Sequence, residues 1–448
     1  MVEGMTIGSA KRIYGFLVLQ IIVTLFFPPI GFGSYKLFPC DFTILLGSVA
    51  ALEYLRRQRS PEFVMILRRV MWAAALCTFI WARGFHRPDA PELYSLLDHS
   101  AAKPVAFSPI REAVLAIRLL SWFIGGMTVV YLFKHLERVQ RGAGRTVIEG
   151  LFRILSLCAA LVAGISICCS LFPTCEVLLA ATYHYEIPKD VWNGRAFGVF
   201  QSPLEGGICM GLLLLILMYR VPRSFGRGLS LLAISLGITC TGTVSSWATI
   251  ALLGLRQLAI WAKPHKKLTA LLIMAFCFSI SCFGAFFLNV FLISTKWGGI
   301  WARSLLWHEY VHLLASRWDT LLFGIGFHAN YVDNSYLWFF TRGGMLGLLT
   351  IGTLFSRSVV NSWEQWSESQ KTVILFLAIT SFFMDTIILR PVVYLVICIV
   401  LPWLTVCRKQ NEESKPSDHV DLEFAFFPSS LTKRRRAPAR EHSQVLGR

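Results

Sequence analysis

The stretch 147–171, VIEGLFRILSLCAALVAGISICCSL, decides the fold class of this chain. Its two charged side chains, Glu149 and Arg153, lie near its start, and the other residues are apolar or small. A helix needs about 20 mostly apolar residues to cross the hydrocarbon core of a bilayer. In that core each backbone N–H and C=O must form a hydrogen bond within the protein, and a helix provides these bonds within a single segment. We therefore expect a membrane-spanning helix here.

Similar apolar stretches recur along the chain. Of its 448 residues, 55% are hydrophobic and 15% are charged, whereas soluble proteins average about 25% charged residues. This composition excludes a water-soluble enzyme, a disordered protein and a small disulfide scaffold. We predict an all-α, polytopic membrane protein with about twelve transmembrane helices. The predicted helices are 14–33, 38–55, 69–84, 113–133, 147–171, 204–220, 229–242, 244–262, 268–293, 335–356, 372–388 and 392–407.

The excess of basic residues indicates how the chain threads the membrane. Its formal net charge is +17, which in a soluble protein would suggest nucleic-acid binding. In membrane proteins Lys and Arg are enriched in cytoplasmic loops. Basic runs lie between alternate predicted helices, for example at 56–59 and 263–267. We expect these loops and both termini to lie in the cytoplasm, and we expect no nucleic-acid partner.

The two sides of the predicted membrane domain, 1–407, differ in loop length. The outer side has three long segments, at about 85–112, 172–203 and 294–334, in which we expect short helices. Long external segments indicate that the protein works at that surface. The remaining segment, 408–448, is a basic tail that we expect to be disordered and to rest on anionic lipid.

One segment of the outer side matches a zinc-binding pattern. His308, Glu309 and His312 form H-E-x-x-H, in which two histidines on one helix face bind zinc and the glutamate acts as base. No third ligand stands in a matching position. The other interpretation is an amphipathic helix on the membrane surface, anchored by residues such as Trp307 and Trp318. We expect no bound metal.

Several ionisable residues fall near the outer ends of predicted helices. Charged groups inside a bilayer are costly and often functional. They form either a polar cavity that opens outward or a set of separate interfacial side chains. The residues are Asp41, Arg118, Glu205, Arg342 and Asp385, with Arg390 just beyond the end of a helix.

Two outer stretches carry short motifs in a defined order. The first, 194–203 GRAFGVFQSP, has an arginine, a Gly-x-Phe and a proline before an apolar helix. The second begins at 301–307 WARSLLW, passes through 322–327 LFGIGF and 332–337 VDNSYL, and closes at 343–348 GGMLGL. Between the two stretches lies a turn, 241–246 TGTVSS. This series resembles the O-antigen ligase and polymerase family of bacterial inner-membrane proteins, although the family often has an arginine in that turn.

The resemblance implies a membrane glycosyltransferase at the periplasmic face of the bacterial inner membrane. Such an enzyme transfers a saccharide from undecaprenyl diphosphate to an acceptor sugar hydroxyl, with inversion and without a metal or cofactor. It acts in the assembly of surface polysaccharide, either O-antigen or exopolysaccharide. The expected partners are the lipid-linked oligosaccharide, membrane lipid and other polysaccharide-assembly proteins. Family ligases have His before Asn where this chain has Asp333-Asn334, which favours a polymerase over a ligase.

Arginines at the motif positions suit the charge that develops on the leaving diphosphate. A guanidinium stays charged and its planar fork matches phosphate oxygens. We expect Arg195 and Arg303 to bind the diphosphate, with Arg342 reaching the same site from within its helix. The alternative for Arg195 and for Arg303 is a surface or interfacial cation.

A base must accept the proton of the attacking hydroxyl. Asp333 and His328 are both candidates for this catalytic role, and Asn334 is expected to position the acceptor. The alternative is that Asp333 and Asn334 cap the helix that follows them.

Two other function classes remain open at this point. About twelve spans with both ends inside also fit a transporter or flippase for polysaccharide or lipid-linked saccharide. The long outer loops and the absence of a visible internal repeat favour the enzyme. The third reading is an intramembrane zinc protease built on His308 and His312.

Overall fold

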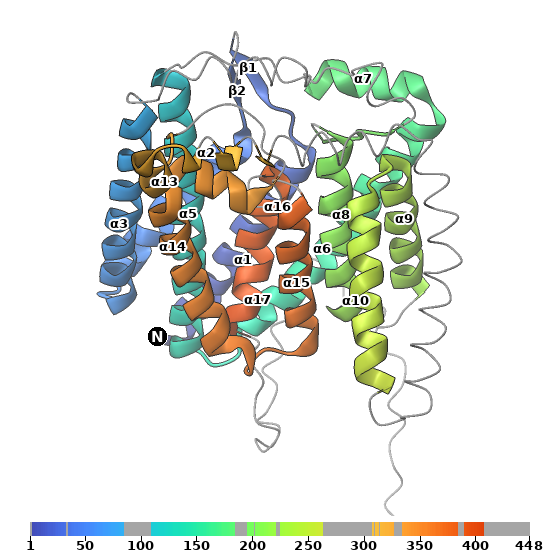
Figure 1. Cartoon of the computed structure of the whole chain (residues 1–448). Coiled ribbons are helices and arrows are strands. Elements are labelled where there is room, and N and C mark those ends of the chain that lie inside the picture. The colour runs from blue at the N-terminus through green and yellow to red at the C-terminus, as the bar shows by residue number, and fades with distance from the viewer. Residues whose placement is uncertain are drawn as a thin grey trace, which may run out of the picture. The chain divides into compact units, whose positions relative to one another are not determined.

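The computed structural model describes most of the chain and shows a helical protein with one small sheet (Figure 1). Its contacts separate a compact unit, Met1–Lys409, from Gln410–Arg448. The described residues are 2–32, 35–84, 109–183, 195–200, 202–220, 225–262, 307–308, 310–312, 314–326, 334–383 and 389–406.

The observed helices coincide with eleven of the predicted apolar stretches. The predicted helix at 268–293 lies outside the described residues. Two short helices, α7 (Pro173–Tyr183) and α13 (Trp318–Phe323), lie within the predicted outer segments. The long elements are α1 (Val2–Phe26), α2 (Pro39–Arg57), α3 (Pro61–Arg83), α5 (Pro109–Val139), α6 (Ala143–Leu171), α8 (Pro203–Arg220), α9 (Phe225–Thr241), α10 (Val244–Ala262), α14 (Ser335–Trp363) and α15 (Glu368–Phe383), followed by the continuous run of α16 (Arg390–Leu395), the π-helical turn η3 (Val396–Val400) and α17 (Leu401–Val406).

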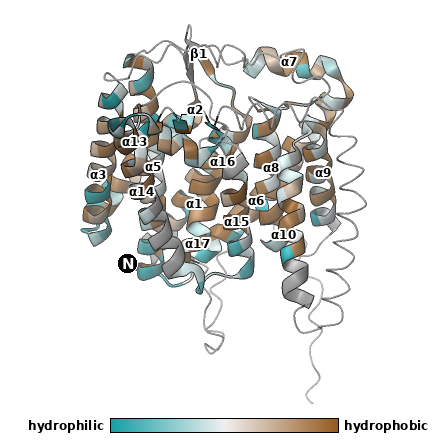
Figure 2. Cartoon of the chain, in the orientation of Figure 1, coloured by the Kyte–Doolittle hydropathy of each residue, from teal (hydrophilic) through white to brown (hydrophobic). Residues whose placement is uncertain are grey.

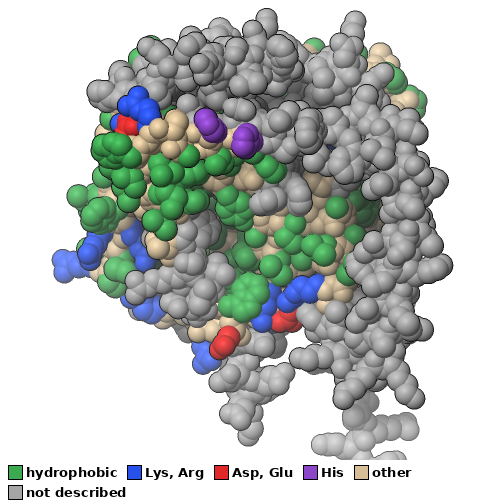
Figure 3. Space-filling model, viewed as in Figure 1, with side chains coloured by type: hydrophobic (Ala, Val, Ile, Leu, Met, Phe, Trp, Pro, Cys, Tyr) green, Lys and Arg blue, Asp and Glu red, His purple; other side chains and the backbone are tan. Residues whose placement is uncertain are grey.

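Three helices in the described part of the chain are long and apolar enough to cross a membrane: Pro61–Arg83, Glu112–Val139 and Ala143–Leu171. Pro203–Tyr219, Gly226–Thr241 and Arg390–Val406 are shorter apolar helices. Hydropathic colouring shows apolar residues along the helices and polar residues gathered toward their ends (Figure 2). On the face drawn in Figure 3, hydrophobic side chains likewise lie between charged ones. These features indicate a membrane protein, whereas the twelve-span arrangement stays a prediction.

The prediction of a helix over 14–33 is wrong at its end. Helix α1 stops at Phe26, and β1 (Ile30–Phe32) then pairs antiparallel with β2 (Tyr35–Leu37). The reason is Pro28-Pro29, because proline lacks an N–H and disfavours helical geometry in the residue before it. The protein therefore carries a short hairpin where an all-α chain was predicted.

Helix α8 lies at the centre of the packing. Every residue from 205 to 217 is buried, and α8 contacts α6, α9, α10, α15 and α16. A second group of contacts joins α5 to α2, α3 and α17. These five helices therefore pack around α8 and fix the position of its first turn.

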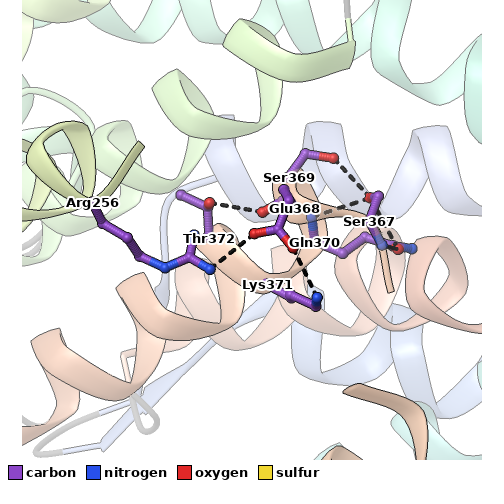
Figure 4. A network of polar contacts seen from close by, with 7 residues as sticks. All are labelled: Arg256, Ser367, Glu368, Ser369, Gln370, Lys371 and Thr372. Carbon is purple, nitrogen blue, oxygen red and sulfur yellow. Dashed lines mark hydrogen bonds and ion pairs between the residues drawn. The ribbon is translucent and has the colours of Figure 1, made fainter. Parts of the chain in front are cut away.

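A polar network ties α10 to the start of α15 (Figure 4), and a hydrogen bond extends it to α17. Arg256 Nη2 lies 2.9 Å from Glu368 Oε2, and Lys371 Nζ lies 2.8 Å from Glu368 Oε1. The hydrogen bond from Lys371 lowers the pKa of Glu368, with a further contribution from Arg256. Gln370 Nε2 donates to the backbone oxygen of Trp403 at 2.9 Å. We assign this network a structural role.

Candidate functional site

Three of the six predicted site residues lie in the described part of the chain. They are Arg195, Arg342 and Asn334, while Asp333, His328 and Arg303 lie outside it. The described contacts place Arg195 beside the turn between α9 and α10, and Arg342 in α14.

Arg195 closes the end of helix α9. Its Nε donates to the backbone oxygen of Thr241 at 2.8 Å, and its Nη2 donates to that of Gly242 at 3.0 Å. The last carbonyls of a helix have no partner within the helix, and its C-terminus favours a cation. Gly242 has φ +60°, and a Cβ there would lie 3.0 Å from Arg195 Nε. The turn thus depends on both the glycine and the arginine.

Other residues near Arg195 are also bonded to neighbouring elements. Phe197 N donates to Glu176 Oε1 of α7 at 3.1 Å, and Thr243 Oγ1 donates to the backbone oxygen of Pro203 at 2.9 Å. Gly198 has φ +61° and packs against Ser166 of α6. Arg195 and Pro203 of the first motif therefore both contact the turn at 241–243, although Arg195 and Thr241 are 46 positions apart.

These contacts give Arg195 a structural role that the sequence reasoning missed. The role was visible only in part, because Thr241-Gly242 indicates a turn but does not reveal which side chain closes it. Its predicted role as a diphosphate ligand stays a prediction.

The second motif series contains a close approach of two backbone segments. Gly344 has φ +62° and ψ −161° and interrupts α14 with a kink. A Cβ on Gly344 would overlap the carbonyl of Leu322, and one on Gly324 would lie 2.5 Å from the carbonyl of Arg342. Only glycine fits at such positions, since it has no side chain and tolerates positive φ. We call this pair of segments the glycine junction.

Backbone hydrogen bonds hold the glycine junction together. Ile325 N donates to the oxygen of Thr341 at 2.8 Å, and Gly326 N donates to that of Arg342 at 3.2 Å. The Gly-x-Gly and Gly-Gly motifs are thus two halves of one contact between the segment after α13 and the middle of α14.

Arg342 lies beside this junction and is 3% exposed. Its Cζ is 3.8 Å from the centroid of the Trp338 ring, which is a cation–π contact. Its Nη1 donates to the backbone oxygen of Trp338 and to Thr341 Oγ1, both at 3.2 Å. The side chain is therefore enclosed by α14 and its neighbours, and its predicted role as a diphosphate ligand stays a prediction.

Asn334 caps helix α14. Its Oδ1 accepts a hydrogen bond from Leu337 N at 3.0 Å, as expected for an N-cap residue. The capping alternative is therefore confirmed for Asn334. A cap at a helix start is compatible with a binding role, because exposed N–H groups at this end favour anions.

An ion pair connects the glycine junction to α3. Arg83 Nη2 lies 3.3 Å from Asp319 Oδ2, and it also donates to the backbone oxygen of Gly324 at 3.3 Å. Arg317 Nε lies 3.1 Å from Asp319 Oδ1. Burial raises the pKa of Asp319, but the hydrogen bonds from Arg317 and Arg83 outweigh it and the pKa is lowered. No motif in the sequence pointed to Arg83.

Ionisable residues from the predicted outer set meet in a second cluster. Arg118 Nε of α5 lies 3.2 Å from Asp41 Oδ2 of α2. The hydroxyl of Tyr394 in α16 donates to Asp41, and Trp122 Nε1 donates to that hydroxyl at 2.9 Å. We call these four residues the Asp41 cluster. They are brought together, so separate interfacial positions do not describe Asp41 and Arg118.

Arg390 lies next to the Asp41 cluster. Its Cζ is 3.2 Å from the centroid of the Phe38 ring, and Arg118 approaches the same ring at 5.8 Å. The charges of Arg118, Asp41 and Glu205 all act on its guanidinium. Glu205 is in the first turn of α8, directly after the Arg195 loop. The cluster and that loop therefore belong to one region.

The histidines of the H-E-x-x-H pattern are exposed. The rings of His308 and His312 lie 6.4 Å apart between centroids, and Glu309 lies outside the described residues. In the part of the chain that the structure covers, no group of three or more His, Cys, Asp or Glu side chains is placed to hold a metal.

Comparison with protein-family models, curated proteins and solved structures finds no match to this chain. The functional argument therefore depends on the motifs and on how the structure arranges them.

Proposed function

We propose that the chain is a membrane glycosyltransferase of the O-antigen ligase/polymerase type, with polymerase favoured over ligase. One observation carries the proposal: Arg195 is bonded to the turn at Thr241 and Gly242. Two stretches that resemble the family in sequence are thus in contact in space. The glycine junction supports the proposal in the same way, since two further motifs of the series meet there.

The proposed reaction is a direct displacement at the anomeric carbon of a saccharide on undecaprenyl diphosphate. The acceptor hydroxyl oxygen forms a bond to that carbon, the bond to the diphosphate oxygen breaks, and the configuration inverts. Asp333 or His328 accepts the hydroxyl proton. Arg303, Arg195 and Arg342 stabilise the charge that develops on the diphosphate. No step needs a metal or a cofactor.

The position of α14 suits such chemistry. Asn334 is its N-cap, so Asp333 immediately precedes the helix start. The unpaired N–H groups and the dipole at a helix start favour negative charge. Arg342 follows in the same helix, two turns further on. Asp333 and Arg342 are therefore nine positions apart in the sequence, and Arg342 lies in a helix whose course is fixed at the glycine junction.

The proposed location is the periplasmic face of a bacterial inner membrane, with both termini in the cytoplasm. The apolar helices support a membrane location, and the distribution of basic residues supports the orientation. In this setting the lipid-linked saccharide is the donor, and other polysaccharide-assembly proteins are the expected partners.

Cells that carry variants of the chain test the proposal. Arg303→Gln and Asp333→Asn are expected to leave single saccharide units on lipid, with the protein still inserted at normal levels. Arg145→Gln is the matched control, because Arg145 is exposed and pairs with Glu149 across one turn of its own helix. Long glycans at normal levels in both Arg303→Gln and Asp333→Asn cells would exclude these site residues.

The alternative, a flippase or transporter of lipid-linked saccharide, predicts another outcome in the same cells. Loss of a flippase traps saccharide units on the inner face of the membrane. Loss of a polymerase leaves single, unpolymerised saccharide units on lipid at the outer face.

A further inference from the structure

Arg390 is a partly buried cation with an unusual environment. It begins α16, and its guanidinium carbon lies 3.2 Å from the centroid of the Phe38 ring. Its Nε is buried and has no hydrogen-bond partner among the residues that the structure describes. The side chain as a whole keeps partial exposure. Arg390 is therefore enclosed, yet it remains open enough for a small group to approach it.

This arrangement is costly for the protein alone. Burying a charged group without hydrogen bonds carries a large desolvation penalty. The ring of Phe38 offsets part of it through a cation–π contact, and the charges of Asp41 and Glu205 offset a further part, whereas the like charge of Arg118 adds repulsion. Buried unsatisfied donors are rare in native structures and call for an explanation, such as an ion that occupies the site.

The Asp41 cluster fixes the second cation of the site. Asp41 accepts hydrogen bonds from Arg118 Nε and from the Tyr394 hydroxyl, which Trp122 Nε1 orients from 2.9 Å away. Asp41 thus binds the guanidinium of Arg118 through the Nε atom. Because Arg118 and Arg390 approach the same Phe38 ring, the two guanidinium groups converge on one small region.

We propose that Arg390 and Arg118 form a binding site for a phosphate or diphosphate group. The planar fork of a guanidinium donates two parallel hydrogen bonds to phosphate oxygens, which would supply the partners that Arg390 lacks. The charge of Glu205, at the start of α8, also acts on Arg390, so the site adjoins the segment that follows Arg195. The phosphate belongs either to a lipid headgroup or to a free anion.

The inference deepens the proposed function and rests on it only for the identity of the lipid. If the chain is a glycosyltransferase, this site receives the diphosphate of the donor or product lipid. Binding of phosphate is measured without glycosyl transfer. The binding site can therefore be refuted while the proposed transferase activity stands, and the reverse is also true.

Binding experiments on the purified full chain test the site. In detergent, inorganic diphosphate is titrated by calorimetry. In vesicles of phosphatidylcholine with and without phosphatidic acid, the thermal midpoint of the protein is compared. Binding of inorganic diphosphate in the titration identifies a free-anion site, and a raised thermal midpoint with phosphatidic acid alone identifies a headgroup site. Both outcomes support the proposal, and the absence of any effect in both arms overturns it.

Variants locate the binding at Arg390. Arg390→Gln is expected to weaken binding by about tenfold or more, because a hydrogen bond to a charged group is lost. Arg145→Gln, at an exposed position on another helix, is expected to bind as the unchanged chain does. Without ligand, Arg390→Gln is expected to keep or raise the thermal midpoint, because a buried charge that lacks hydrogen bonds is removed.

Two results overturn the assignment. The first is diphosphate binding by Arg390→Gln that equals that of the unchanged chain. The second concerns Arg390→Lys, which keeps the positive charge but loses the planar guanidinium. If Arg390→Gln does not fold, diphosphate binding by Arg390→Lys is the test. Full-strength binding by this variant would show that the guanidinium is not a ligand.

Discussion

Replacing Gly344 by alanine should break the glycine junction. Gly344 has φ +62° and ψ −161°, and a Cβ built on it would overlap the carbonyl of Leu322 and lie 2.5 Å from Gly324 N. The atoms in the way are backbone atoms, so no side-chain rotation relieves the overlap. The two backbone segments must therefore separate.

The expected loss of stability follows from these contacts. An alanine held in a backbone region that suits only glycine costs about 1–3 kcal/mol. Separation of the segments also breaks the bonds from Ile325 N to Thr341 and from Gly326 N to Arg342, at 2.8 and 3.2 Å. Each such bond contributes about 1 kcal/mol net. Gly344→Ala should therefore destabilise the protein by at least about 3 kcal/mol.

The assay is thermal unfolding of the purified protein in detergent, together with glycan length in cells. Gly254→Ala is the matched control, because Gly254 lies in α10 and a Cβ there would meet no heavy atom within 4 Å. This control should keep or slightly raise the midpoint, since alanine favours a helix over glycine by about 1 kcal/mol. Equal midpoints and equal glycan lengths for Gly344→Ala and the unchanged chain would refute the reasoning.

Three further predictions concern the neighbouring contacts. Arg195→Gln should lower the thermal midpoint, since each lost charge-assisted bond to the end of α9 is worth about 1.5–3 kcal/mol; an unchanged midpoint would show that the loop does not depend on it. Because the pKa of Asp319 is lowered in the folded protein, its pairs with Arg83 and with the neighbouring Arg317 stabilise the fold at neutral pH and are lost as the pH falls below 3.8. Asp319→Asn should remove this acid dependence in unfolding measured against pH, and an unaltered pH profile would contradict it. His308→Ala should leave glycan length unchanged, and metal analysis of the purified chain should find no zinc; bound zinc that this variant loses would revive the protease interpretation.

Local chemistry made much of the fold predictable. Apolar stretches such as 147–171 coincide with helices because a continuous apolar run can bury its backbone only by bonding within itself. The cap at Asn334 was also foreseeable, because it is a local contact. The accepting side chain of Asn334 and the donating amide of Leu337 are three residues apart. The strand after α1 was missed because Pro28-Pro29 was read as part of a long helix.

Long-range pairings could not be read from the sequence. Arg118 and Asp41 are 77 positions apart, and Tyr394 and Asp41 are 353 apart. Hydropathy places each of them near a helix end, but helix packing decides which ends meet. The bond between the Arg195 guanidinium and α9 is of the same kind. The structural role of Arg195 and the packing of Arg390 against Phe38 therefore emerged only from three-dimensional contacts.

The central claim is that this chain extends or transfers lipid-linked saccharide. The most direct test is to reconstitute the purified chain in vesicles with saccharide units on undecaprenyl diphosphate and to measure product length and free undecaprenyl diphosphate over time. The account predicts longer glycans and an equal release of the lipid diphosphate as each bond forms. Units that cross the bilayer at unchanged length, with no lipid diphosphate released, would contradict it and identify a transporter.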